Sequence, residues 1–415
     1  YILCSGDPDS LDALLLPQLG VALVDGTAPH VVEPKYPGAV EQYVNLGDCY
    51  DRAGLRAIRG EILTCMDGYK EHYQRAYRCL DAAAEIQTDV RAMLATPALE
   101  EKLAALEGGE AAVTAASGIG AITSALYAIL EKGDHLLCAK GLFFHSNILM
   151  NDFLSKLGVD VSFADFQDLE DVKRNLKPNT KLLFLETPTN PKLGVVDVRA
   201  VAALAKEHGC LLMVDSTFAP PPIQRALELG ADLVVHSLTK YINGHGDALG
   251  GGVIGPKHLI EKIKYPSMPC FTGAALSPFN AWLIMRGMAT LDLRVRRHCE
   301  NALAIAKFLQ SSPYVEKVIY PALPGDAGYE LCQKQMNGLG GGIVAVWLKE
   351  EVKGLARRAA DYKLCNNTKV ITIATSLGEA NTLIQVENDD MIRIAVGLEN
   401  AADLIEDLRQ ALEAI

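Results

Sequence analysis

The sequence has no closely spaced cysteine pairs, no excess of basic residues and no long apolar run. Its ten cysteines are scattered among 415 residues without a Cys-x-x-Cys pair or a compact Cys/His cluster, which argues against a metal site and a disulfide framework. The 51 acidic residues outnumber the 39 basic ones and leave a formal charge of -12. This excludes a general basic surface that could bind nucleic acid or an anionic membrane. We therefore expect a cytoplasmic enzyme with reduced thiols that acts on a small molecule.

A membrane-spanning segment is not indicated either. The longest apolar stretch near the start, residues 14–24, is too short to cross a bilayer and is interrupted by Pro17, Gln18 and Gly20. Internal repeats and low-complexity tracts are absent from the sequence. With 49% hydrophobic and 22% charged residues, the composition is that of a globular protein of about two or three domains.

The hydrophobic pattern divides the chain into an N-terminal arm with a helical segment (1–95), a large α/β domain (96–292) and a C-terminal α+β domain (293–415). In the large domain, short apolar runs alternate with amphipathic helices, which is typical of βαβ units that build a mostly parallel sheet. Its strands are predicted at residues 135–139, 181–185, 211–215, 232–236 and 252–255. A helix over 198–208 is predicted to end at Gly209.

The two outer parts have patterns of their own. Helical periodicity runs over residues 55–94 of the arm. In the C-terminal domain, the pattern predicts strands at 315–320, 342–348, 369–375 and 391–396 and helices at 294–309 and 401–412. We therefore expect a smaller mixed sheet with helices packed against it.

A lysine and an aspartate follow two of the predicted strands. Ser237, Thr239 and Lys240 form a Ser-x-Thr-Lys turn after one strand, and Asp215 ends another. The carboxyl ends of parallel strands meet at the edge of a sheet where ligands bind. Lys240 is therefore a candidate Schiff-base lysine, and Asp215 could pair with the ring nitrogen of pyridoxal phosphate, which needs an anion there. Taken singly, such a lysine is more often solvated, and such an acid is more often a helix cap or metal ligand.

Small residues precede a predicted helix at residues 114–122. The amides of Gly118 and Ile119 can point along the helix axis at an anion, an arrangement that suits a single phosphate. The segment is not Gly-x-Gly-x-x-Gly, and it lacks the Gly-Lys-Ser/Thr of a nucleoside-triphosphate loop. The alternative is that the small residues only allow close packing of helix and strand.

An arginine lies within the predicted strand 391–396. From the C-terminal domain, Arg393 could clamp the α-carboxylate of an amino acid bidentately, and Ser376 upstream could add a hydroxyl. The alternative is an edge-strand arginine that faces water. The joint occurrence of lysine, aspartate, anion site and arginine says more than any one of them.

Together these residues resemble the Cys/Met-metabolism family of pyridoxal-phosphate enzymes, which includes methionine γ-lyase, cystathionine γ-lyase, cystathionine γ-synthase and O-acetylhomoserine sulfhydrylase. The resemblance covers about residues 98–415, with motifs at 98–109, 186–191, 237–240 and 297–302. It implies an α/β fold of the aspartate-aminotransferase type, the PLP-dependent transferase fold, and a homotetramer of two active dimers. The implied cofactor is pyridoxal 5'-phosphate (PLP), and the implied partner is an amino-acid substrate, with no nucleic acid and no membrane.

The resemblance also implies roles for individual residues. Lys240 would bind the cofactor as a Schiff base, and Asp215 would pair with its pyridine nitrogen. The implied phosphate-binding residues are Gly118, Ile119, Ser237 and Thr239. The implied substrate-binding residues are Asn190, Ser376 and Arg393.

Three positions near the expected cofactor depart from the family. Phe143 replaces a tyrosine that stacks on the cofactor ring in most members, so the stacking surface is kept but a hydroxyl that could act as a general acid is lost. His145 replaces a cysteine of typical methionine γ-lyases; it could supply an imidazole, or it is merely packed. Cys270 stands where those lyases tend to carry an aspartate. These departures argue against methionine γ-lyase as the specific activity.

A further departure concerns the phosphate. Family members have a Tyr-x-Arg pattern that reaches the phosphate of the neighbouring subunit, but the expected place, residues 88–94, has no such pattern. Of two upstream triplets, the nearer contains Tyr73 and Arg75. We hypothesise that Tyr73 and Arg75 bind the phosphate after a helical insertion; the alternative is that they are ordinary helix-surface residues.

The segment after Ser376 is shorter than in the family, with residues 385–390 leading almost directly to Arg393, so the substrate entrance is expected to be reshaped. We predict γ-elimination or γ-replacement on a γ-substituted L-amino acid, through a quinonoid and a β,γ-unsaturated intermediate, with Lys240 moving protons. Because Phe143 lacks a hydroxyl, an activated leaving group is favoured. The alternatives are a β-lyase that gives pyruvate from cystathionine or cysteine, and a catalytically degenerate binding protein.

Overall fold

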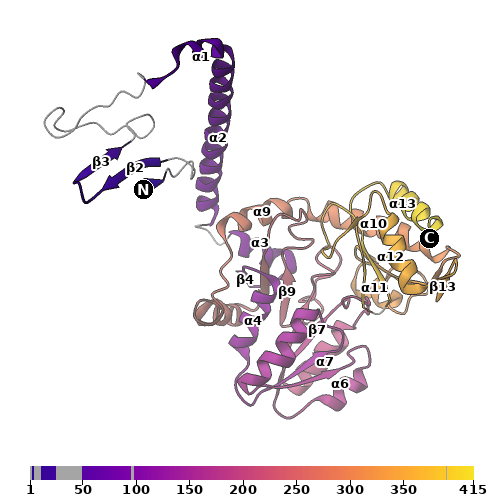
Figure 1. Cartoon of the computed structure of the whole chain (residues 1–415). Helices are drawn as coiled ribbons and strands as arrows, with labels where there is room; N and C mark the ends of the chain where they lie inside the picture. The colour runs from indigo at the N-terminus through magenta and orange to yellow at the C-terminus, as the bar shows by residue number, and fades with distance from the viewer. Residues whose placement is uncertain (1, 4–10, 25–48, 95–97, 389) are drawn as a thin grey trace. The chain divides into compact units, whose positions relative to one another are not determined.

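The computed structural model describes residues 2–3, 11–24, 49–94, 98–388 and 390–415 (Figure 1). The chain forms two compact units, residues 1–82 and 83–415. The boundary predicted between arm and large domain, after residue 95, lies within residues 95–97, outside the described part of the chain.

The first unit contains a small antiparallel sheet and a long helix. Strand β1 (Ile2–Leu3) pairs with β2 (Leu11–Leu16), which pairs with β3 (Val21–Val24). The residues that interrupt the apolar stretch form the turn between β2 and β3, where Gly20 N donates to Pro17 O at 3.3 Å. Helix α1 (Arg52–Ala57) is followed by α2 (Arg59–Leu94), which confirms the helical periodicity and continues past residue 82. Sequence patterning did not predict the strands.

A seven-stranded sheet forms the centre of the large domain (Figure 1). Strands β5 to β9 run parallel to one another, whereas β10 is antiparallel to both of its neighbours, β4 and β9. In spatial order the strands are β4 (Ala111–Ala115), β10 (Gly251–Gly255), β9 (Leu233–Ser237), β8 (Leu211–Asp215), β7 (Thr180–Glu186), β5 (His135–Ala139) and β6 (Asp160–Ala164). The five predicted strands are confirmed; β4, rich in alanine, and β6, with alternating polar residues, were missed.

The helices of the large domain begin and end where local chemistry dictates. Helix α7 (Val198–His208) starts at Asp197, whose carboxylate accepts from Ala200 N at 3.0 Å, and ends at Gly209 with φ of 76°. The predicted Gly209 cap is therefore confirmed. Helices α4 (Gly118–Ile129) and α7 turn their apolar faces to the sheet and close one buried core with the strands. Helix α3 (Ala98–Glu107) contacts β4 and β10 and joins a second core.

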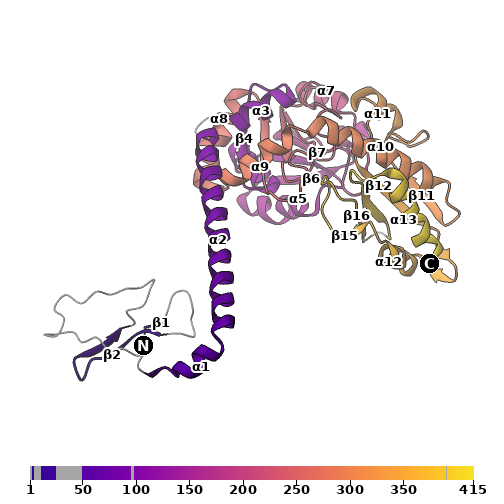
Figure 2. The same ribbon diagram turned by 90° about the horizontal axis from the view of Figure 1, so that it is seen from above.

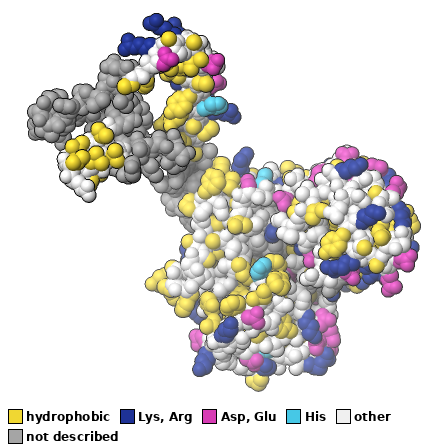
Figure 3. All heavy atoms as spheres, in the orientation of Figure 1, with side chains coloured by type: hydrophobic (Ala, Val, Ile, Leu, Met, Phe, Trp, Pro, Cys, Tyr) yellow, Lys and Arg dark blue, Asp and Glu magenta, His cyan; other side chains and the backbone are white. Residues whose placement is uncertain are grey.

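The C-terminal domain is built on a five-stranded sheet with the order β11-β12-β17-β16-β15. The strands are β11 (Val315–Ile319), β12 (Ile343–Leu348), β17 (Ile392–Ala395), β16 (Leu383–Val386) and β15 (Thr372–Ile373), and the helices are α10 (Leu291–Gln310), α11 (Tyr329–Gln335), α12 (Arg357–Asn367) and α13 (Ala401–Glu413). Helix α10 packs on β11, β12 and α13 (Figure 2). On the face shown in Figure 3, acidic and basic side chains intermingle over this domain.

One strand prediction in this domain was wrong in length. The strand predicted at 369–375 is only Thr372–Ile373, because the backbone N–H groups of Lys369, Val370 and Ile371 donate to the carboxylate of Asp407 at 2.8–2.9 Å and not to a neighbouring strand. The adjacent strand β16 was not predicted. The other predicted strands and helices of this domain are confirmed to within a few residues.

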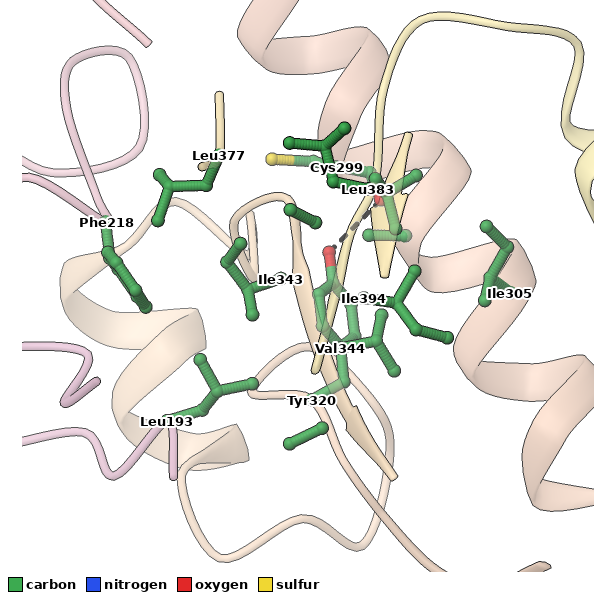
Figure 4. Close-up of a cluster of buried hydrophobic side chains, with 14 of the residues drawn as sticks. Leu193, Phe218, Cys299, Ile305, Tyr320, Ile343, Val344, Leu377, Leu383 and Ile394 are labelled. Carbon is green, nitrogen blue, oxygen red and sulfur yellow. Dashed lines mark hydrogen bonds between the residues drawn. The ribbon is translucent and has the colours of Figure 1, made fainter. Parts of the chain in front are cut away.

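The second core joins the large domain to the C-terminal sheet (Figure 4). At its centre the buried Tyr320 donates from its hydroxyl to Cys299 O at 3.1 Å and Gly341 O at 2.9 Å. Phe218, from the loop after β8, and Leu377, from the loop before β16, pack in the same cluster. Loops from both domains are therefore anchored to one core. In the described part of the chain, no helix is long and apolar enough to cross a membrane.

Candidate active site

Three neighbouring parallel strands, β7, β8 and β9, end at the same edge of the large sheet. Glu186 and Asp215 end β7 and β8 and are paired in register, and Asp215 is opposite Val235 of β9. Ser237 ends β9, and Lys240 follows it in a turn. The predicted meeting of Asp215, Ser237 and Lys240 at one sheet edge is confirmed by this register.

Asp215 is held by the threonine two residues after it. Its Oδ1 accepts from the backbone N–H of Thr217 at 3.0 Å and from the hydroxyl at 2.6 Å, and Thr217 Oγ1 accepts from Ser237 N at 2.9 Å. Burial raises the pKa of Asp215, and the two hydrogen bonds from Thr217 oppose that rise. Thr217 therefore links the carboxylate of one strand to the end of the next, a role that sequence reasoning missed.

Lys240 is partly buried where the large domain meets the C-terminal domain. Its Nζ donates to Ser376 Oγ at 3.2 Å, and its backbone N–H donates to Ser237 O at 3.1 Å. Burial lowers the pKa of Lys240, and the nearby charge of Arg393 lowers it further. A lowered pKa increases the share of neutral amine, which is the nucleophilic form.

The loop that contains Ser376 packs closely on the turn that contains Lys240. Gly378 has φ of 76°, and a Cβ added there would lie 2.6 Å from Tyr241 N. Only glycine allows this approach without displacing the backbone. The contact explains how a residue of the C-terminal domain reaches the lysine of the large domain.

The first turn of α4 adjoins the end of β9. Ser117 caps the helix and accepts from Gly120 N at 3.1 Å. A Cβ added at Gly118 would lie 2.9 Å from Ser237 Cβ, so the helix start and the serine are in close contact. The hydroxyl of Thr239 bonds to the backbone of Gly250, at 3.2 Å to the carbonyl and 3.1 Å to the amide. Helix amides and the Ser237 hydroxyl thus border one small region suited to an anion.

Arg393 lies in the middle of the C-terminal sheet and is buried. Its strand β17 lies between β12 and β16, so the alternative of an edge-strand arginine that faces water is wrong. Its Nη1 donates to Asn190 Oδ1 at 3.2 Å, and its Nη2 donates to Thr375 O at 2.8 Å. Nε lies 3.5 Å from Glu387 Oε1. Asn190, from the large domain, and Arg393, from the C-terminal domain, therefore form one polar cluster beside Ser376.

Phe143 and His145 lie at the start of helix α5 (Phe144–Ile148). The ring centroid of Phe143 is 5.1 Å from that of His145, whose ring also meets Phe144 edge-on at 5.5 Å. Both predicted residues are exposed, Phe143 to 40%. An exposed aromatic face at this point is available to a planar ligand ring.

Glu186 is a buried residue of the site that sequence reasoning did not single out. It is only 4% exposed, and its Oε2 accepts from Phe143 N at 2.8 Å. Burial raises its pKa well above the usual range; the charge of Asp215 raises it further, and backbone N–H groups of Phe143 and Asn190 oppose the rise. Its place at the end of a strand, at the start of Glu-Thr-Pro-Thr-Asn-Pro, was the available signal.

Tyr73 and Arg75 lie in the other unit, on helix α2. Both are exposed, and the Tyr73 ring contacts Tyr69 and Tyr77 at centroid distances of 4.7 and 5.9 Å. Their binding to a phosphate therefore stays a prediction.

The donor set matches the functional groups of PLP. Lys240 offers a partly buried amine to the aldehyde, and Asp215 offers a buried carboxylate to the ring nitrogen. The amides at the start of α4 and the hydroxyl of Ser237 suit a phosphate, in a region that a Cβ at position 118 would narrow. Fold and site thus define the class: a PLP-dependent enzyme with the aspartate-aminotransferase type of α/β fold.

Comparisons with known proteins identify the family. The model of the Cys/Met metabolism PLP-dependent enzymes matches residues 90–388. The chain is 44% identical to L-methionine gamma-lyase of Treponema denticola (77% of this chain, 83% of that protein) and 40% identical to canavanine gamma-lyase of Pseudomonas canavaninivorans (76% and 82%). The crystal structure of metB from Corynebacterium glutamicum superposes with a TM-score of 0.72 at 37% identity, covering 76% of this chain and 84% of that one. The chain belongs to the Cys/Met-metabolism family of PLP-dependent enzymes, whose cofactor is PLP.

Proposed function

We propose that this enzyme acts on a γ-substituted L-amino acid, by γ-elimination to a 2-oxo acid and ammonia or by γ-replacement. The observation that carries the proposal is the cluster of Lys240, Ser376, Asn190 and Arg393, in which an amine and a buried guanidinium come together from two domains. An amino acid presents an amine and a carboxylate to these two groups. The gamma-lyases among the relatives, for methionine and canavanine, support chemistry at the γ-carbon.

The residues of the site divide the work between binding and proton transfer. Bound PLP supplies an electron sink for charge that develops at the substrate Cα. Arg393 and Asn190 orient the α-carboxylate, and Lys240 Nζ moves protons between Cα and Cβ. Asp215, held by Thr217, pairs with the ring nitrogen, and Phe143 offers its face to the ring.

The leaving group is the finer part of the proposal. Phe143 has no hydroxyl, so it cannot protonate a departing thiolate as a tyrosine at this position could. We therefore propose an activated leaving group, such as a carboxylate ester, a phosphate or a halide. Methionine, the substrate in the names of several relatives, would then be a poor substrate.

The quaternary structure is also part of the proposal. The family resemblance supports a homotetramer of two active dimers, in which Tyr73 and Arg75 of one subunit bind the phosphate held by its neighbour. Both side chains are exposed on α2, as such an interaction between subunits requires.

The test starts from the full-length protein purified with PLP. We expect a visible absorbance band of lysine-bound cofactor that is lost in Lys240→Ala. O-acetylhomoserine, methionine, cystathionine and cysteine are then compared by initial rate and by product. We expect O-acetylhomoserine to give a four-carbon 2-oxo acid. Its kcat/KM should exceed that for methionine by about tenfold or more, which corresponds to a difference of ~1.4 kcal/mol in activation free energy.

Each other outcome has a definite meaning. Efficient turnover of methionine or cystathionine contradicts the proposed leaving-group class. Pyruvate as the main product establishes β-elimination in place of γ-chemistry. Failure of the wild-type protein to bind PLP or to turn over any of these amino acids contradicts the proposed function and favours the degenerate binding protein.

A further inference from the structure

A carboxylate of this chain lies on the side of Arg393 that the other contacts leave open. Glu387 Oε1 is 3.5 Å from Nε of Arg393, while Nη1 and Nη2 are engaged by Asn190 and Thr375. Each nitrogen of the guanidinium therefore has an oxygen beside it before any substrate arrives.

Glu387 is held in place by the strand hairpin that contains the arginine. Gln385 is opposite Arg393 in the register of β16 and β17, and its Nε2 donates to Glu387 Oε1. The backbone N–H of Glu387 donates to Met391 O at 2.7 Å, which closes the turn. The carboxylate is thus fixed by its own turn and by a neighbouring amide as well as by the arginine.

The pair is shielded enough for its charges to matter. The side chain of Arg393 is 6% exposed and that of Glu387 is 22% exposed. Burial lowers the pKa of Arg393, and the negative charge of Glu387 opposes that change. Charges at this separation interact several times more strongly beside low-dielectric protein than in bulk water. Part of the attraction that Arg393 would offer to a substrate carboxylate is therefore already cancelled.

We propose that Glu387 is an internal competitor for the carboxylate-binding arginine and weakens the binding of every amino-acid substrate. This inference rests on the proposed function, because it takes Arg393 as the group that binds the α-carboxylate. A substrate carboxylate must share the guanidinium with Glu387 or displace it, and in both cases two like charges come close together. The effect belongs to binding, since Glu387 contacts Arg393 and lies outside the contacts of Lys240.

The short connection between β16 and β17 makes this arrangement possible. Only residues 387–391 separate the two strands, so an acidic residue just after β16 stays within reach of an arginine on β17. This short connection is part of the segment after Ser376 that is shorter than in the family.

The test compares Glu387→Gln with a matched control, Asp390→Asn, in the full-length PLP enzyme. The glutamine keeps an oxygen that can accept from Gln385 but removes the charge. Asp390 lies in the same turn, but its carboxylate pairs with Arg358 at 2.8 Å and not with Arg393, and its φ of 49° suits asparagine. KM for the best amino-acid substrate and the inhibition constant of butyrate, a carboxylate without an amine, are measured for each protein.

In Glu387→Gln, we expect KM and the inhibition constant of butyrate to fall by about three- to tenfold, with kcat nearly unchanged. This is the effect of removing one partly screened negative charge beside Arg393. In Asp390→Asn, both constants are expected to stay at the wild-type values. A rise of KM in Glu387→Gln overturns the proposal and makes Glu387 a residue that orients Arg393. Unchanged constants in both variants overturn it as well.

Failure of the proposed function is recognised separately. It would appear as a wild-type protein that binds no PLP or turns over no amino acid. Competition between Glu387 and a carboxylate at Arg393 would still show in that case, as tighter binding of butyrate by Glu387→Gln than by the wild type.

Discussion

At the scale of the residue, two buried carboxylates end neighbouring strands and cannot ionise with equal ease. Asp215 is supported by two hydrogen bonds from Thr217, whereas the pKa of Glu186 is raised by burial and then by the charge of Asp215. The two environments therefore give the two carboxyl groups different pKa values. Asp215 is the one that ionises more readily, and Glu186 is the one that more readily keeps its proton. Glu186 then acts as a positioning residue that accepts from the backbone of Phe143.

This assignment predicts different effects for two substitutions at Glu186. Glu186→Gln keeps a neutral acceptor, so kcat/KM should change by less than about threefold, within the net worth of one hydrogen bond. Glu186→Ala leaves the Phe143 N–H without its acceptor, and we expect about a tenfold or greater loss. Activity and the pH dependence of the cofactor's visible band are measured together. A displaced pH profile in Glu186→Gln would contradict a neutral Glu186.

At the scale of the element, helix α12 contains a buried aspartate, Asp361. Asp361 is fully buried, and among the described residues neither of its carboxylate oxygens has a hydrogen-bond partner. Burial and, to a lesser extent, the charge of Asp390 raise its pKa to about 7, against the opposing charges of Arg357 and Arg358. As pH rises, Asp361 therefore loses its proton at a higher pH in the folded state than in the unfolded chain.

The sign of the stability effect follows from this difference. A raised carboxyl pKa favours folding below the unfolded value near 4, and that contribution is lost as pH rises to about 7. Asp361→Asn removes the titration, so we expect its free energy of unfolding at pH 8 to exceed the wild-type value by about 1–3 kcal/mol. Urea unfolding at pH 5 and pH 8 measures the difference.

Asp407, on helix α13, is the matched comparison. Its carboxylate accepts from the N–H groups of Lys369, Val370 and Ile371, and these bonds outweigh burial and lower its pKa. Asp407→Asn should therefore destabilise the protein at neutral pH, where Asp361→Asn stabilises it. Equal effects of the two substitutions would contradict the roles assigned to both residues.

At the scale of the whole molecule, the first unit adds structure that precedes the family match. The family model begins at residue 90, whereas α2 begins at Arg59 and contains the exposed Tyr73 and Arg75. A phosphate needs charge-assisted donors as well as the amides at the start of α4. An arginine supplied by the first unit of another subunit would meet that need.

This hypothesis predicts that Arg75→Ala lowers PLP affinity by about tenfold, the effect of one charge-assisted hydrogen bond. Arg78→Ala is the control, because Arg78 is an exposed arginine on the same helix whose Nε donates to Gln74 O at 3.3 Å. PLP affinity is measured by equilibrium titration, and the mass of each variant by light scattering, with a tetramer expected. Equal PLP affinity of wild type and Arg75→Ala would remove Tyr73 and Arg75 from the phosphate site.

The sequence by itself determined the class of fold, the family and the edge of the sheet where the chemistry lies. Short apolar runs, helical periodicity and the cap at Gly209 are local signals, so most strands and helices of residues 98–415 could be predicted. The polar residues that follow β8 and β9 could be predicted to meet because parallel strands end at one edge.

Only the tertiary structure decided which contacts these residues make. Arg393 is buried because its strand lies between two others, and Glu387 lies beside it. Glu186 accepts from the backbone of Phe143. These contacts depend on pairings between segments that are far apart in the chain. The strand predicted at 369–375 was wrong in length for the same reason, since its N–H groups are taken by Asp407 from another element. Local patterns report the preference of a segment, whereas burial, charge balance and hydrogen-bond partners arise only when distant segments pack together.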